Sequence, residues 1–66
     1  MVVFANGAPL ELDESATVGT LIEALGLSGR VVAVEHNGEA VDRRAVASTR
    51  LREGDRCEVV RAVAGG

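Results

Sequence analysis

Several residue types on which common functions depend are scarce in this sequence of 66 residues, which has one cysteine, one histidine, one aromatic residue and no lysine. One cysteine excludes a disulfide framework and a cysteine-based metal cage, and one histidine removes the other common route to a metal site. The net charge of −3 and the single aromatic residue, Phe4, leave neither the basic face nor the stacking surface that nucleic-acid binding needs. We therefore expect no bound metal and no nucleic-acid partner.

Long apolar segments are also missing. The longest runs, at 1–5 and 31–34, are far shorter than the about 20 residues of a membrane-spanning helix. No charged segment followed by an apolar stretch opens the sequence, so we expect no secretory signal. The length fits one small domain, and the scarcity of cysteine fits a reducing compartment. These features predict a cytoplasmic domain with no membrane partner.

A β-hairpin is predicted at the start of the sequence. Asn6-Gly7 separates residues 1–5 from residues 8–13, and this dipeptide favours a two-residue turn in which both residues have positive φ. Such a turn sets the register by pairing residues that are equidistant from it. Leucines alternate with acidic residues in the second strand, so the leucine face is predicted to be buried and Val2 and Phe4 to point away from the core.

The remaining elements indicate an α+β fold. Thr17 is a suitable helix N-cap, apolar residues recur on one face over 18–25, and Gly26 is a typical residue after a helix end. Strands are predicted at 31–36, where a nearly continuous apolar run favours a central position, and at 55–63. One main helix packed across a mixed sheet of four to five strands, with the first and last strands parallel in its middle, is the β-grasp.

The C-terminal end is the strongest functional candidate. Residues 1–63 are predicted to form the β-grasp domain and residues 64–66 a flexible Gly-Gly tail. Gly65 and Gly66 have no side chains, so they can enter a narrow site and present an unhindered terminal carboxylate to another protein. A frayed terminus without a function is the alternative interpretation, because chain ends are often small and disordered.

Four apolar residues form a second candidate site. Val2 and Phe4 on the first strand, with Val60 and Ala62 on the last, are predicted to lie adjacent on the exposed face of the sheet. Contiguous exposed apolar patches often mark binding sites. We interpret these residues as a partner-binding patch beside the tail.

No combination of side chains predicts catalysis. Cys57 is in phase with Val59 on the last strand, so it is expected to be a buried small hydrophobe and not a reactive thiolate. His36 has no cysteine or carboxylate at the spacing of a triad or a metal site, and the scattered carboxylates fit turns and solubility. We therefore expect no catalytic residue and no metal ligand.

The sequence resembles the ThiS-type sulfur carriers of thiamin biosynthesis, which are ubiquitin-like proteins of the ThiS/MoaD superfamily. The likeness covers essentially the whole chain. Its most specific parts are VEHNGEAV at 34–41 with Arg43 after it, LREGDRCEVV at 51–60, and AVAGG at 62–66.

The resemblance implies that Gly66 is modified. An E1-like adenylating enzyme of the ThiF type would use Mg-ATP to join AMP to the Gly66 carboxylate. Sulfur from a cysteine desulfurase or a rhodanese-like protein would then displace AMP and leave a C-terminal thiocarboxylate, from which a thiazole synthase of the ThiG type would take the sulfur. Gly65 and Ala64 would be the spacer. The chain itself would be a protein co-substrate and not an enzyme, and would bind no cofactor.

Some positions depart from the pattern of that family. Asp42 stands where a proline is common, Ala45 and Val46 replace an aromatic residue, Cys57 replaces an aliphatic one, and Ala64 often appears as glycine or a polar residue. These departures leave the terminal glycines intact and bear on the pathway. The small subunit of molybdopterin synthase and the carriers for cysteine or secondary metabolites are alternatives, and a non-catalytic ubiquitin-like interaction module is an alternative of another class.

Overall fold

The computed structural model describes residues 1–62. Its elements, in chain order, are β1 (Val2–Ala5), β2 (Ala8–Glu11), α1 (Val18–Ala24), β3 (Val32–His36), β4 (Glu39–Ala40), the 3-10 turn η1 (Arg43–Ala45) and β5 (Arg56–Arg61). Residues 63–66 lie outside the described residues, and with them the predicted tail and the predicted domain boundary.

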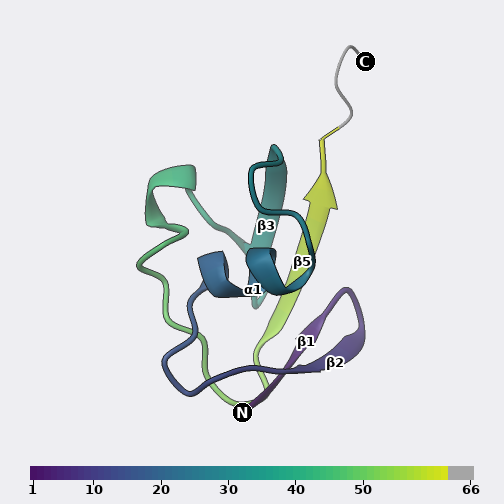
Figure 1. Ribbon diagram of the computed structural model, residues 1–66, viewed down its shortest axis with the longest axis vertical. Helices are drawn as coiled ribbons and strands as arrows, with labels where there is room; N and C mark the ends of the chain where they lie inside the picture. Colours follow the sequence, from purple (N-terminus) through teal and green to yellow (C-terminus); the bar gives the residue numbers. More distant parts are fainter. Residues whose placement is uncertain (63–66) are drawn as a thin grey trace.

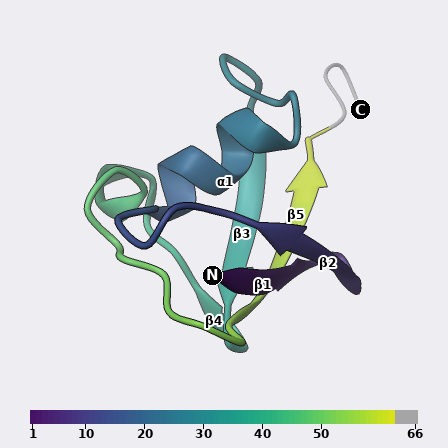
Figure 2. The same cartoon turned by 60° about the horizontal axis from the view of Figure 1, so that its bottom comes forward.

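The strands form one mixed sheet in the order β2-β1-β5-β3-β4. β1 and β5 are parallel neighbours in the middle of the sheet, and the other neighbours are antiparallel. The helix α1 crosses one face of this sheet, as two views show (Figures 1 and 2). The predicted α+β fold, a ubiquitin-like β-grasp, is confirmed. Within residues 1–62 there is no helix of the length and apolar character that crossing a membrane requires.

The predicted hairpin is also confirmed. Asn6 has a φ of 52° and Gly7 a φ of 83°, as a type I′ turn requires. The turn places Val3 opposite Leu10 and Ala5 opposite Ala8. Val3 and Ala5 are buried in the core, whereas Val2 and Phe4, which alternate with them along β1, are only half-buried.

The helix begins and ends where the local sequence predicts. The Thr17 hydroxyl accepts a hydrogen bond from the Thr20 N–H, and the Thr20 hydroxyl accepts one from the Thr17 N–H. This reciprocal pair satisfies two N–H groups that a helix start leaves free. Gly26, with a φ of 75°, follows the last turn. Leu21 is the largest of the fully buried side chains of α1.

One strand lies nearer the edge than its composition predicts. β3 lies next to the last strand of the sheet, and its far neighbour β4 covers only Glu35 and His36. Its side chains alternate, with Val34 buried and Ala33 exposed. The nearly continuous apolar run favours a central position, but β3 is one strand from the edge of the sheet, and α1 covers only one face of that sheet. The core is therefore one layer between helix and sheet, made of Val3, Ala5, Val18, Leu21, Ile22, Val34, Leu51, Cys57 and Val59.

Candidate functional site

The strand that leads to the C-terminal residues is held on both sides. β1 pairs with the start of β5, where Phe4 lies opposite Arg56, and β3 pairs with β5 from Cys57 to Arg61. Figure 1 shows β5 running past β1 and ending well beyond the β1–β2 hairpin. The central position of β5 therefore fixes where the chain leaves the sheet, at Ala62.

The side chain of Asn6 continues the pairing beyond the end of β1. Its Nδ2 donates to the Val59 carbonyl at 3.2 Å, and its Oδ1 accepts from the Val59 N–H at 2.8 Å. We call these two hydrogen bonds the Asn6 clamp. Val59 is buried, so its backbone groups need protein partners. The asparagine that the sequence assigns only to a turn thus also holds the strand that carries the C-terminal end.

The second Asn-Gly turn makes a similar contact. Asn37, with a φ of 51°, accepts a hydrogen bond from the Arg56 N–H on its side-chain oxygen at 2.9 Å. Its own N–H donates to the Arg56 carbonyl at 2.8 Å. Both hairpin turns therefore position β5, one near its start and one near its middle.

The four predicted patch residues do not form one contiguous patch. Val60 lies four residues beyond Arg56 on β5, which is roughly 13 Å at about 3.3 Å per residue. Phe4 lies opposite Arg56, whose guanidinium carbon is 4.9 Å from the centre of the Phe4 ring. Both Val2 and Phe4 are half-buried. The expected adjacency to Val60 and Ala62 was wrong because the parallel register aligns β1 with only the first part of β5.

The structure instead places four apolar residues together where β5 ends. Ala33 lies opposite Val60, and the Ala62 N–H donates to the Val31 carbonyl at 2.9 Å. Val31 and Val60 are the two large apolar residues that are most exposed among the described residues, at 63% and 62%. We call Val31, Ala33, Val60 and Ala62 the distal patch. Sequence reasoning missed Val31 and Ala33. Alternation separates them from Val32 and Val34, but a run of apolar residues does not show which of the two faces is exposed.

An acidic pair lies next to the distal patch. Glu35 pairs with Glu58 across β3 and β5, and both are exposed. The ion pairs within residues 1–62 involve neither carboxylate. Like charges directly opposite in a sheet are destabilising. The distal patch therefore has an acidic border that would favour basic residues on a bound partner.

The opposite end of β5 is fixed by Asp55. One carboxylate oxygen of Asp55 lies 2.7 Å from His36 Nε2 and accepts from the Arg52 N–H at 2.9 Å, and the other accepts from Asn37 Nδ2 at 3.2 Å. Burial alone raises the pKa of this carboxyl, but the hydrogen bonds from His36, Arg52 and Asn37 together lower its pKa below the usual range. The pair of His36 and Asp55 thus joins the β3–β4 turn to the start of β5, which is a structural role.

The predicted burial of Cys57 is confirmed. Cys57 is 1% exposed and packs in the core. Burial and the nearby Asp55 carboxylate raise the pKa of its thiol, which disfavours the thiolate. No group of three or more potential metal ligands occurs within the described part of the chain. Gly66, Gly65 and Ala64 lie outside that part, so the geometry of the site is known up to Ala62.

Comparison with known proteins assigns the family. The sequence profile of the ThiS family matches residues 3–66. The chain belongs to the ThiS family. Its structure is similar to the crystal structure of the thiamine biosynthesis protein ThiS from Geobacter metallireducens, with a TM-score of 0.81, 36% identity and full coverage of both chains. A solution structure of a thiamine biosynthesis protein from the same organism gives a TM-score of 0.78 at 36% identity, covering 100% of this chain and 88% of that one. The ThiS-type, ubiquitin-like resemblance is therefore confirmed.

Two further proteins are similar to this ThiS-family chain, one of them much longer and the other more distant in sequence. It is 36% identical over 66 residues to a protein of Paramagnetospirillum magneticum that is named thiazole synthase. The match covers the whole of this chain but 20% of that protein, so this chain spans about a fifth of its relative. The crystal structure of SAMP1 from Haloferax volcanii has a TM-score of 0.63 at 22% identity over 98% of this chain and 97% of that one, which shows a shared fold.

Proposed function

We propose that this ThiS-family chain is a sulfur carrier of thiamin biosynthesis, in which the carboxyl group of Gly66 becomes a thiocarboxylate. The observation that supports this most is the family match, which extends to residue 66 and includes both terminal glycines. The chain would act as a co-substrate and not as an enzyme. In agreement, the potential nucleophile Cys57 is buried and His36 is engaged with Asp55.

The chemistry has two steps. In the first, a carboxylate oxygen of Gly66 attacks the α-phosphorus of ATP in the active site of a ThiF-type enzyme, pyrophosphate leaves, and an acyl adenylate forms. In the second, a sulfur nucleophile attacks the Gly66 carbonyl carbon, so that a C–S bond forms as the bond to AMP breaks. Sulfide gives the thiocarboxylate directly. A persulfide on a cysteine desulfurase or a rhodanese-like protein gives an acyl disulfide, which a thiol cleaves to the thiocarboxylate.

A thiazole synthase is the proposed sulfur acceptor. The support is that a protein named thiazole synthase contains a segment 36% identical to this entire chain. No comparable observation favours molybdopterin synthase or a plain interaction module.

The distal patch is the proposed docking surface for the activating enzyme or the acceptor. Its apolar residues lie beside Ala62, the last described residue before the tail, and their exposure leaves them free to be covered by a partner. The acidic border formed by Glu35 and Glu58 favours a partner with arginine or lysine at the edge of its interface. Mg-ATP would belong to the activating enzyme, and this chain would hold no cofactor of its own.

A semisynthetic variant tests the first step. Cys57 provides a native ligation point, so a synthetic peptide for 57–66 that ends in a carboxamide can be joined to residues 1–56 and compared with a ligated wild-type chain. With a ThiF-type enzyme and Mg-ATP, the wild-type chain is expected to release pyrophosphate and the amide none, because the nucleophilic carboxylate is gone. Equal pyrophosphate release from both chains would contradict the proposal.

A further inference from the structure

The two edges of the sheet are protected to different extents. At one edge, β2 carries Pro9, which has no N–H to donate, and the exposed Glu11. At the other edge, β4 covers β3 only at Glu35 and His36, so no described strand pairs with residues 31–33 on that side. Edge strands usually carry proline, charge or a covering segment, because free backbone groups can pair with another chain. Residues 31–33 are apolar and lack each of these within the described structure.

Backbone groups of Val32 face this open edge. The Ala62 N–H donates to the Val31 carbonyl and the Asn37 N–H to the Arg56 carbonyl, so odd-numbered residues of this segment bond to β5. Hydrogen bonds alternate along an antiparallel strand, so even-numbered residues point the other way. The Val34 carbonyl does so, accepting from the Val41 N–H at 2.9 Å. The N–H and the carbonyl of Val32 are therefore available to an added strand.

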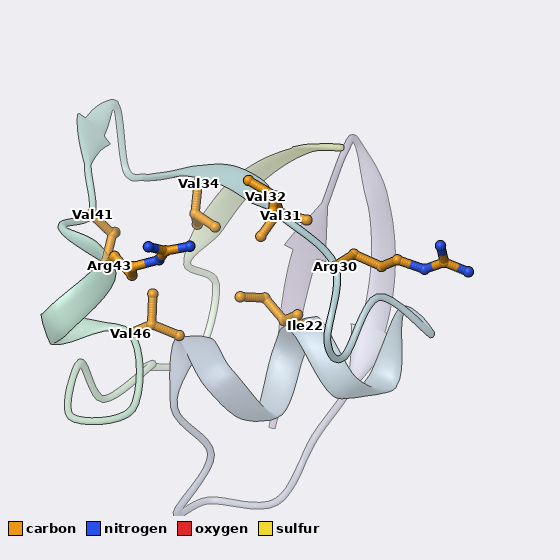
Figure 3. A pocket seen from close by; sticks show the side chains of 8 residues that line it. All are labelled: Ile22, Arg30, Val31, Val32, Val34, Val41, Arg43 and Val46. Atoms are coloured by element: carbon orange, nitrogen blue, oxygen red, sulfur yellow. The ribbon is translucent and has the colours of Figure 1, made fainter. Parts of the chain in front are cut away.

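An apolar hollow lies beside this edge. It has a volume of about 180 Å³ and is lined by Ile22, Arg30, Val31, Val32, Val34, Val41, Arg43 and Val46. Figure 3 shows Ile22 of α1 on one side, the valines of β3 above, and Val41 and Val46 across from them. An added strand at Val32 would direct alternate side chains into this hollow, because Val32 and Val34 lie on the side of the sheet that faces α1.

One charge lies over the hollow. Figure 3 shows Arg43 directed toward the valines of the hollow and Arg30 directed away from it. Arg43 is exposed, and the ion pairs of the described residues leave its guanidinium free, whereas its neighbour Arg44 bonds to Asp42 through Nε at 3.2 Å. The residues that line the hollow include no acid. An occupant with a carboxylate would therefore supply the missing partner.

We propose that the open edge at Val32 and this hollow bind an extended segment of a partner protein, in which an aliphatic residue and an acidic residue are two positions apart. The segment adds a strand to β3. Its backbone pairs with Val32, its aliphatic side chain fills the hollow between Ile22 and Val46, and its carboxylate pairs with Arg43. Strand addition draws its affinity from main-chain hydrogen bonds and its specificity from pockets for alternate side chains. This site uses none of residues 63–66 and is independent of the proposed sulfur carriage.

A defined peptide tests the site on the full-length chain. The probe is a capped octapeptide, acetyl-TVTDTVTD-amide, titrated into isotope-labelled protein at low salt while backbone amide shifts are recorded. Saturation is expected to shift the amides of Val32, Ile22 and Val46 and to slow hydrogen exchange at the Val32 N–H. Arg43→Gln is expected to raise the Kd on the order of tenfold, the loss of one charge-assisted hydrogen-bonded pair. The matched variant Arg44→Gln, with the same change in charge at the next residue, is expected to leave the Kd nearly unchanged.

A second pair of variants tests the backbone contact. Val32→Pro removes the N–H that faces the open edge but none that faces β5, a position at which a strand tolerates proline. Val32→Ala shortens the same side chain and keeps the N–H. With folding verified by circular dichroism, the proline variant is expected to bind the peptide far more weakly than the alanine variant.

Three outcomes would overturn the proposal. The first is no shift at Val32 with millimolar peptide, or shifts that map to β2 or to Val60 and Ala62 on the other face of the sheet. The second is an equal effect of Arg43→Gln and Arg44→Gln. The third is a shift of the Val32 amide when the protein alone is concentrated, together with a dimer in sedimentation, which would identify a second copy of this chain as the occupant.

Discussion

Removing the Asn6 clamp is expected to destabilise the fold at the strand that carries the C-terminal end. Asn6→Gly keeps the positive φ of the turn, which is 52° at this residue, and removes both side-chain hydrogen bonds to Val59. A net hydrogen bond contributes about 1 kcal/mol, and a buried backbone group left without a partner costs about 1–3 kcal/mol. Because water can reach the vacated space, we expect a loss in the free energy of unfolding of about 2 kcal/mol, or a fall in Tm of about 8–16 °C for a domain of this size.

The assay is urea unfolding followed by far-ultraviolet circular dichroism, since the chain has no tryptophan or tyrosine to report by fluorescence. Ser28→Gly is the control, because Ser28 is exposed and glycine there adds only conformational freedom to the unfolded chain. Asn6→Asp keeps the acceptor for the Val59 N–H and loses the donor, so an intermediate stability is expected. If Asn6→Gly lost no more stability than Ser28→Gly, the Asn6 clamp would contribute nothing to the stability of the fold.

Further predictions concern Asp55, Cys57 and the distal patch. Hydrogen bonds lower the pKa of the Asp55 carboxyl in the folded state, so its contribution to stability is present above about pH 4 and is lost as the pH falls below that value. Asp55→Asn should therefore flatten the acid side of a curve of unfolding free energy against pH, measured by urea unfolding. The Cys57 thiol is buried and its pKa is raised, so in the native chain it should react with a thiol reagent such as dithiobisnitrobenzoate only as fast as the chain opens. In denaturant it should react at once, and labelling of the native chain at that same rate would contradict the burial of Cys57. Val60→Glu, at a residue 62% exposed, should weaken binding to the activating enzyme or to thiazole synthase in calorimetry with little change in Tm, whereas an unchanged Kd would remove the distal patch from the interface.

The hairpin and the helix could be predicted because their signals are local. Asn6-Gly7 specifies both the turn and the register that follows from it, and Thr17 and Gly26 mark the helix ends. The central parallel pair also followed from the order of elements, since a hairpin, a crossing helix and further strands leave few ways to close one core.

The exposed apolar patch could not be predicted in the same way, because its composition depends on long-range register. Phe4 and Val60 share a face by alternation, but only the alignment of Phe4 with Arg56 shows how far apart they lie. The exposure of Val31 depends on which faces of β3 are covered, and a run of apolar residues does not indicate this by itself. The contact from Asn6 to Val59 spans 53 residues, so no local pattern could reveal it.

Intact mass after reaction with a ThiF-type enzyme, Mg-ATP and sulfide tests sulfur carriage most directly. We expect a gain of about 16 Da, the replacement of one oxygen by one sulfur, confined to the C-terminal peptide that contains Gly66. An enzyme shown to be active on another ThiS-family carrier should be included, so that a negative result refers to this chain. A chain whose mass stayed unchanged with every such enzyme, or which gained sulfur at Cys57 and not at Gly66, would contradict the proposed function.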